Sequence, residues 1–218
     1  MRLEDIWPIF GLDIETPRLS LRPVRDDDLP GLVHAALDGI HDPSRMPFGV
    51  PWTDAPAEDL PRNTAVFQWH LRGQVTPSHW HIAFAIHREG RVIGSQDLSA
   101  HQFSDRRTVE TGSWLTQSAQ GDGIGTEMRA ALLQFAFDHL GAEWAESSAA
   151  AWNEASLGVS RKLGYQPNGV SRVSPRAGEP VDHQKVRLAK QDFVRPDWTI
   201  AVRGAGPALA QLGIDPVT

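Results

Sequence analysis

The chain has 218 residues, no cysteine and a formal net charge of −6. This length suits one domain with a substantial core, and the lack of cysteine excludes disulfides, thiolate metal sites and a cysteine nucleophile. The negative charge disfavours a nucleic-acid-binding surface, and no apolar run approaches the roughly 20 residues that cross a bilayer. Because acidic Glu4 and Asp5 precede the apolar run 6–12, where an export signal carries basic charge, we expect a cytoplasmic protein with no membrane partner.

The first sixty residues contain one strand pattern, one helix pattern and a long irregular stretch. Residues 19–24 predict a first strand, and residues 26–37 predict a helix that opens with an acidic run at its positive end. Residues 42–61 are rich in proline and lack periodicity, which predicts an irregular excursion. A second helix is expected over 63–72.

The middle of the chain predicts a hairpin, a further strand and a helix. Residues 80–87 and 91–98 alternate in polarity and flank the turn 88–90, which is typical of a hairpin. Residues 110–115 read as extended, and residues 126–137 have apolar side chains at helical spacing.

The last third predicts two strands and a tail. We expect strands over 143–149 and 182–189, the latter being the last strand. The sequence predicts a single domain over 1–218, with 190–218 as a C-terminal extension. A helix-like run over 207–212 ends this extension, and it could pack on a neighbouring subunit of a homo-oligomer.

The loop 120–126 lies between the extended segment and the predicted helix, so its glycines stand at a helix start. Unpaired backbone N–H groups at such a start attract anions, and residues without a Cβ let a pyrophosphate approach closely. A Walker loop is excluded because Gly125 is followed by Thr126 and Glu127, and a dinucleotide fingerprint lacks its third glycine at Thr126. A plain turn between strand and helix remains the alternative.

Three segments together carry a family resemblance. Residues 120–125 resemble the acyl-CoA pyrophosphate loop of the GNAT superfamily of N-acetyltransferases, and residues 153–165 resemble the second signature of that family. Residues 16–24, followed by Asp27 and Leu29, are similar to the opening of its ribosomal-protein N-acetyltransferase subgroup. The resemblance covers roughly residues 16 to 190.

This resemblance implies a mixed α/β fold with a central, mostly antiparallel twisted sheet that is splayed in the middle and flanked by helices. It implies an acyl-CoA-dependent N-acyltransferase in which a primary amine attacks the thioester directly, without a metal. The pantetheine arm would pair with the splayed strand, where Gln117 replaces a frequent proline, and the N–H near Leu115 would polarise the thioester carbonyl. The expected cofactor contacts are Trp114, Leu115, Thr116, Gln117, Gln120, Gly121, Asp122, Gly123, Ile124, Gly125, Thr126, Asn153 and Ser156.

The resemblance also assigns the proton acceptor. Glu110 corresponds to a strand glutamate of the subgroup and would act as general base through a water, with Asp97 in reserve. The alternative is an ordinary surface glutamate that pairs with Arg106 or Arg107.

The proton donor to the CoA thiolate is a tyrosine in much of the family, and Ser160 takes that position here. Ser160 would hydrogen-bond the sulfur, or it is simply a helix-surface serine. Tyr165 is expected in the core. Asn153 would contact the pantetheine amides or cap its helix.

The acyl group and the acceptor remain open at this point. The length and the Trp-rich N-terminal half resemble a mycobacterial succinyltransferase of the family, which favours succinyl-CoA over acetyl-CoA. The candidate partners for a succinyl carboxylate are His41, Arg45, Arg72, Arg106 and Arg107. The acceptor would be a protein N-terminus, a lysine or a small amine, and a non-catalytic acyl-CoA sensor is the alternative function.

Aromatic and imidazole side chains gather around Trp69 and Trp80. His79 and His81 share one face of a predicted strand, but no acidic or cysteine partner lies at suitable spacing, so we expect no metal site. Core and pocket lining is the preferred interpretation of the cluster.

Overall fold

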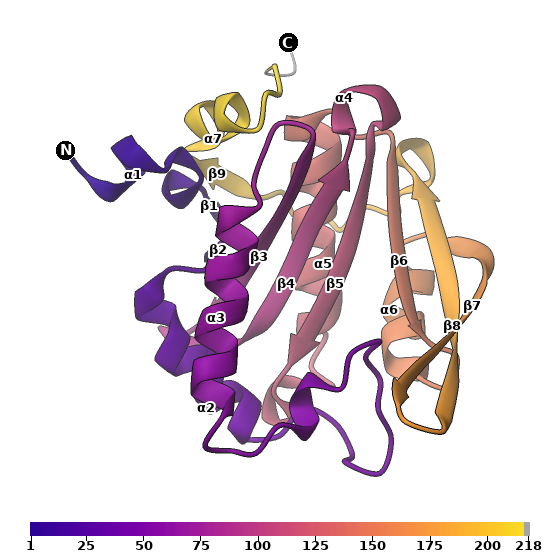
Figure 1. Ribbon diagram of the computed structural model, residues 1–218. Coiled ribbons are helices and arrows are strands. Elements are labelled where there is room, and N and C mark those ends of the chain that lie inside the picture. Colours follow the sequence, from indigo (N-terminus) through magenta and orange to yellow (C-terminus); the bar gives the residue numbers. More distant parts are fainter. Residues whose placement is uncertain (216–218) are drawn as a thin grey trace.

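A computed structural model, which describes residues 1–215, shows one open sheet of nine strands with helices on both of its faces (Figure 1). The strand order is β7-β8-β6-β5-β4-β3-β2-β1-β9, and β5 and β6 are the parallel pair. The strands are β1 Asp13–Glu15, β2 Ser20–Pro23, β3 His79–Arg88, β4 Arg91–His101, β5 Thr108–Leu115, β6 Trp144–Ala150, β7 Gln166–Arg176, β8 Glu179–Ala189 and β9 Ala201–Arg203. The α-helices are α1 Leu3–Ile6, α2 Leu29–Leu37, α3 Leu60–Gly73, α4 Phe103–Arg106, α5 Ile124–Phe135, α6 Glu154–Lys162 and α7 Ala205–Gln211.

Helices α2 and α3 cover one face of the sheet, called the front face, and α5 and α6 cover the back face (Figure 1). The alternation of β3 explains this layering. Trp80, Phe84 and Ile86 are buried in the large core behind the sheet, whereas Ala83 and Ala85 belong to the smaller core under α2 and α3.

Most expected elements are confirmed. The hairpin β3–β4, the strands β2, β5 and β6, and the helices α2, α3 and α5 occupy the predicted stretches with shifts of a few residues. A turn of π-helix over Ala136–Leu140 extends α5 toward β6. The predicted mixed α/β class with a mostly antiparallel sheet is correct.

One expectation about the strands is wrong, and one strand had no prediction. The strand β7 was not expected, because its side chains are exposed along most of its length and show no apolar alternation. Strand β8 is not the last one, since β9 pairs with the edge strand β1. Pairing with β9 satisfies backbone groups that β1 would leave free at the edge of the sheet.

The end of the chain packs on its own N-terminal part. Leu209, Leu212 and Ile214 are buried in the main core, and Gln211 accepts a hydrogen bond from the Ile9 N–H over 2.9 Å. Contacts with the turn Pro8–Gly11 hold α7 against this chain. The neighbouring subunit proposed for this segment is therefore not needed to bury its apolar side chains.

The sheet is splayed between β5 and β6, as the resemblance implies. Their ladder runs from the pair Thr108 and Trp144 to the pair Thr111 and Ser147 and stops there, although both strands continue. The edge of residues 112–115 that faces β6 is consequently unpaired. Within residues 1–215, no helix is long and apolar enough to span a bilayer.

Candidate active site

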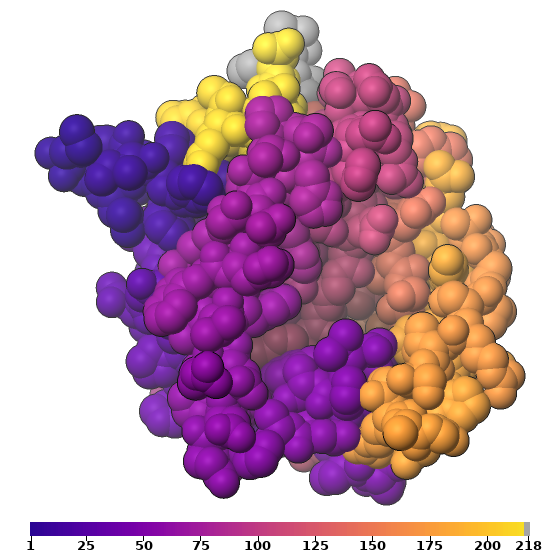
Figure 2. Space-filling model, in the orientation of Figure 1, coloured from indigo at the N-terminus to yellow at the C-terminus, as the bar shows by residue number. Residues whose placement is uncertain are grey.

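A cavity of about 760 Å³ lies at the splayed ends of β5 and β6. Its lining comes from both faces of the sheet, including residues 112–115, the loop before α5, the start of α6 and the strands β7 and β8. The front face is hollowed between α3 and the β7–β8 hairpin (Figure 2). The cavity thus connects the N-terminus of α5 on the back face with an open front face.

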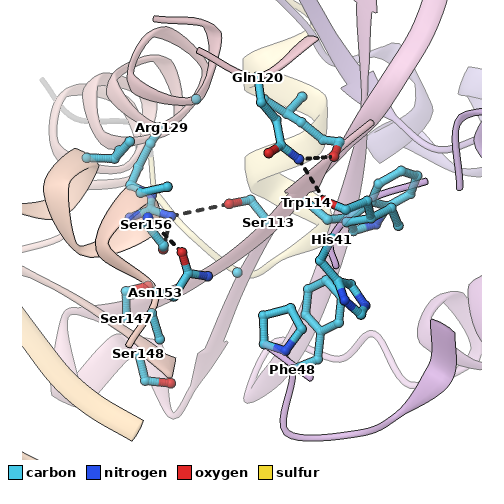
Figure 3. A pocket seen from close by; sticks show the side chains of 18 of the residues that line it. His41, Phe48, Ser113, Trp114, Gln120, Arg129, Ser147, Ser148, Asn153 and Ser156 are labelled. Atoms are coloured by element: carbon cyan, nitrogen blue, oxygen red, sulfur yellow. Dashed lines mark hydrogen bonds between the residues drawn. The ribbon is translucent and has the colours of Figure 1, made fainter. Parts of the chain in front are cut away.

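The loop before α5 has the geometry that the sequence predicts. Gly121 and Gly123 take positive φ angles of 89° and 80°, and Gly123 is the residue from which α5 begins. Gln120 fixes the loop, because its side-chain amide donates to the carbonyls of Ile40 and Leu115 over 2.8 and 2.9 Å (Figure 3). The cavity therefore meets a helix N-terminus whose first N–H groups are available to an anion.

Buried Glu127 ties this loop to the N-terminal part of the chain. Its carboxylate accepts from the Thr16 hydroxyl at 2.6 Å and from Nε of Arg18 at 2.6 Å. Arg18 also donates to the carbonyl of Asp122 over 3.1 Å. The shape of the anion site thus depends on a residue more than a hundred positions away.

The unpaired edge of β5 presents the backbone donor expected near Leu115. The Thr116 N–H donates to the Ile93 carbonyl of β4 over 2.9 Å. Since successive N–H groups of a strand point to opposite sides, the Leu115 N–H faces the splay. The geometry is that of a strand edge that an extended ligand could extend by pairing.

Most of the predicted cofactor contacts are brought together. Those that line the cavity are Trp114, Leu115, Gln117, Gln120, Gly121, Gly123, Gly125, Thr126, Asn153 and Ser156. Three do not line it. Thr116 is buried and its hydroxyl donates to Gly39, Ile124 packs in the core, and Asp122 is exposed beside Arg88.

Asn153 and Ser156 open α6 at the cavity wall. The Asn153 side chain accepts from the Ser156 N–H over 3.1 Å, so it caps the helix as one of the two hypotheses holds. Its amide nitrogen is still free to donate, and both residues line the cavity.

Ser160 is not brought to the cavity surface. It is 2 % exposed, it donates to the Ser156 carbonyl, and its Oγ lies 2.8 Å from Nη1 of Arg129. The expected direct contact with the thiolate therefore does not follow from its position. Tyr165 lies in the core as predicted, and burial raises the pKa of its phenol.

Glu110 lies on the front face of β5, exposed and in register with Glu146 of β6. Arg106 and Arg107 directly precede β5, and neither forms an ion pair with Glu110. Asp97, the reserve candidate, lies 3.2 Å from the imidazole of His81. The Glu110 side chain is outside the cavity lining, on the front face of the sheet.

The irregular excursion forms the front wall of the cavity. Phe48 packs against Trp52, which packs against Trp114, with ring centroids 5.4 and 5.6 Å apart. Asp54 forms a bidentate ion pair with Arg176 of β7 at 2.7 Å. These contacts hold the excursion across the splay.

Several lining residues were not predicted, and two of them, Arg129 and His183, can carry a positive charge. Arg129 of α5 is buried and reaches into the cavity opposite Ser113 (Figure 3). His183 of β8 also lines the cavity, its Nε2 has no hydrogen-bond partner, and burial lowers its pKa. A signal existed for Arg129, since it is the only charged residue in the apolar stretch 128–137.

The aromatic and histidine cluster divides in the structure. Trp80 is fully buried, but Trp69 is exposed and donates to Asp26, so pocket lining is wrong for it. In the part of the chain that the structure describes, no group of three or more potential ligands could hold a metal ion.

Residues 18–166 match the acetyltransferase (GNAT) domain family, and this protein therefore belongs to the GNAT acetyltransferases. The fold agrees with solved structures of that class. Mycobacterium smegmatis RimJ in complex with CoA-disulfide has a TM-score of 0.68 at 18 % identity, over 93 % of this chain and 95 % of that one. RimL, a ribosomal alpha-N-protein acetyltransferase solved with coenzyme A, has 0.63 at 18 % identity, over 80 % and 95 %. A GNAT-family acetyltransferase from Bacillus anthracis has 0.62 at 18 % identity, over 82 % and 99 %.

Proposed function

We propose that this protein transfers an acyl group from acyl-CoA to a primary amine by direct attack of the amine on the thioester. The observation that carries the proposal is a cavity that passes through the splay, from the N-terminus of α5 to the open front face. The pyrophosphate would bind the loop 120–126, and the pantetheine arm would pair with residues 112–115. The amine would then approach from the front.

The front face suits a cationic acceptor. Asp97 and Glu110 occupy neighbouring strands on this face, and acidic groups raise the local concentration of an ammonium ion, whereas Glu146 beside them pairs with Arg187. Glu110 is the general base in this proposal, and a water carries the proton from the amine. A protein N-terminus, a lysine side chain and a small amine all fit this chemistry.

The proposed acyl donor is succinyl-CoA in preference to acetyl-CoA. A succinyl carboxylate needs a cation or several donors, and the front wall offers His41 in the lining and Arg45 stacked 4.1 Å from the ring of Trp152. Arg72 pairs with Asp26 away from the cavity. Of the five candidate partners, His41 and Arg45 are therefore the two that we propose for the succinyl carboxylate.

Calorimetric titration with CoA, acetyl-CoA and succinyl-CoA tests the donor. A tenfold tighter binding of succinyl-CoA than of acetyl-CoA, about 1.4 kcal/mol, is expected. Arg45→Met should remove the difference, whereas the control Arg62→Met on the exposed part of α3 should keep it. Equal affinities of the wild type for the two thioesters would contradict the succinyl-CoA preference and favour acetyl-CoA as the acyl donor.

Release of free thiol tests the reaction itself. With succinyl-CoA, thiol release should depend on an added amine, such as a peptide with a free N-terminus or lysine. Binding of the thioester without amine-dependent release would instead identify a non-catalytic acyl-CoA sensor. A cytoplasmic location and self-association are further proposals, which fractionation of cells and sedimentation of the purified protein would test.

A further inference from the structure

Arg129 is a buried cation at the cavity that the proposed reaction has not used. It projects from the side of α5 that faces β5 and α6, and it is 4 % exposed. Its guanidinium contacts three serine hydroxyls from two other elements, at 2.8 Å for Ser160, 3.2 Å for Ser113 and 3.5 Å for Ser156. Its Nε has no partner in the structure.

No carboxylate of the described residues balances this charge. Among residues 1–215, no acidic side chain lies within 4 Å of the Arg129 guanidinium, although most arginines of the chain form such pairs. Burial lowers the pKa of Arg129, but arginine stays protonated in proteins. A buried charge without a counter-ion is destabilising, and an anion bound in the cavity would offset that cost.

The position of Arg129 relative to the splay indicates which anion this is. Ser113 belongs to the unpaired part of β5, along which the proposed pantetheine arm runs. Ser160 belongs to α6, and Arg129 donates to both serines, so its guanidinium bridges β5 and α6 beside this edge. The guanidinium therefore stands behind the end of the pantetheine arm.

We propose that Arg129 stabilises the CoA thiolate as it leaves. This inference rests on the proposed function. In the reaction the amine nitrogen forms a bond to the thioester carbon, and the carbon–sulfur bond breaks with its electron pair on sulfur. The amine proton passes to Glu110 through water, the guanidinium neutralises the thiolate, and the sulfur later takes a proton from solvent.

The alternative anion is the carboxylate of a succinyl group, and the strand alternation argues against it. Ser113 faces the back of the sheet, while Gly112 and Trp114 on either side of it face the front, where acyl group and amine meet. His41 and Arg45 stand on that front side.

The pKa of the CoA thiol, measured in the binary complex by the ultraviolet absorbance of the thiolate, tests the proposal directly. In the wild-type complex, the pKa of the thiol should be at least one unit lower than in free CoA. At a given low pH, this difference corresponds to a tenfold higher fraction of thiolate. Arg129→Met should remove this shift, and Arg129→Lys should retain part of it. The control Arg161→Met, on the exposed side of α6, should leave it unchanged.

The outcomes separate the possibilities. A thiol pKa in the wild-type complex equal to that of free CoA overturns the proposal, whether or not the Arg129 variants fold. Loss of succinyl-CoA preference in Arg129→Met, with the thiol pKa unchanged, would show that the cation binds the acyl carboxylate instead. Failure of CoA to bind the wild type at all would contradict the proposed function and this inference with it.

Discussion

The two ends of the cavity are built in different ways. The back end consists of two continuous segments, 120–129 and 153–160, in which loop, helix start and lining residues follow one another. The front end joins segments far apart in the sequence, held by the Trp52–Trp114 contact and the Asp54–Arg176 ion pair. In the proposed function, the local backbone geometry of the back end binds the part common to all CoA thioesters, and the long-range assembly of the front end sets the acyl group and the acceptor.

Replacement of the proposed base gives the largest expected effect and should affect only the front end. In Glu110→Gln, kcat should fall by roughly 10²–10⁴-fold because the amine proton loses its acceptor. CoA affinity by calorimetry should not change. The control Glu146→Gln, at the neighbouring register position, should lower kcat far less. A kcat for Glu110→Gln within threefold of the wild type would show that another group accepts the amine proton. His183, in the cavity lining, would then be the first candidate to test.

The back end should be sensitive to loss of its buried carboxylate. Glu127→Ala leaves Arg18 and Thr16 without their shared acceptor and should lower the free energy of unfolding by about 3 kcal/mol. CoA affinity should fall as well, because the loop loses its support. Urea denaturation and calorimetry measure the two effects, with Glu154→Ala of an exposed pair as control. Unchanged CoA affinity in a destabilised variant would show that the loop keeps its shape without this ion pair.

Helix α2, one of the two helices on the front face, begins at Asp28, whose ion pairs and hydrogen bonds stabilise the fold over a defined pH range. Burial raises the pKa of Asp28, but hydrogen bonds from His87, the Arg25 N–H and Arg22 outweigh it and lower the value to about 2 from 3.8. Since the folded pKa is below the unfolded one, the stabilisation is complete above pH 4 and is lost as the pH falls through 2.

Asp28→Asn should therefore cost about 2 kcal/mol at pH 7. The difference from the wild type should vanish near pH 2 in urea denaturation at each pH. A difference that stays constant between pH 7 and pH 2 would show that packing of the side chain, and not its charge, supports α2.

The smallest expected effect concerns the front wall. Arg176→Met removes the ion pair with Asp54 and the hydrogen bond to the Pro43 carbonyl, so the excursion over the cavity should become looser. Because both partners of the pair are partly accessible to solvent, we expect about a threefold rise in KM for the acceptor and no change in CoA affinity. Arg172→Met, in a more exposed pair on the same strand, is the control. A larger loss of CoA affinity than of acceptor affinity would show that the two ends are not independent.

The sequence by itself determined the parts of this protein that depend on neighbouring residues. The glycine loop before α5, the β3–β4 hairpin and the cap of α6 by Asn153 are local structures, and their residue types restrict the backbone to a few conformations. The family signatures lie in the same segments, so the cofactor end and the fold class could be predicted together.

Only the tertiary structure decided which side chains meet. Ser160 and Arg129 are 31 residues apart, and their contact withdraws the serine from the cavity while placing a cation there. Pairing of β9 with β1 joins the two ends of the chain, and exposed β7 is defined by its pairing with β8. Such long-range contacts depend on how the sheet and helices pack, a property that no local pattern of residues records.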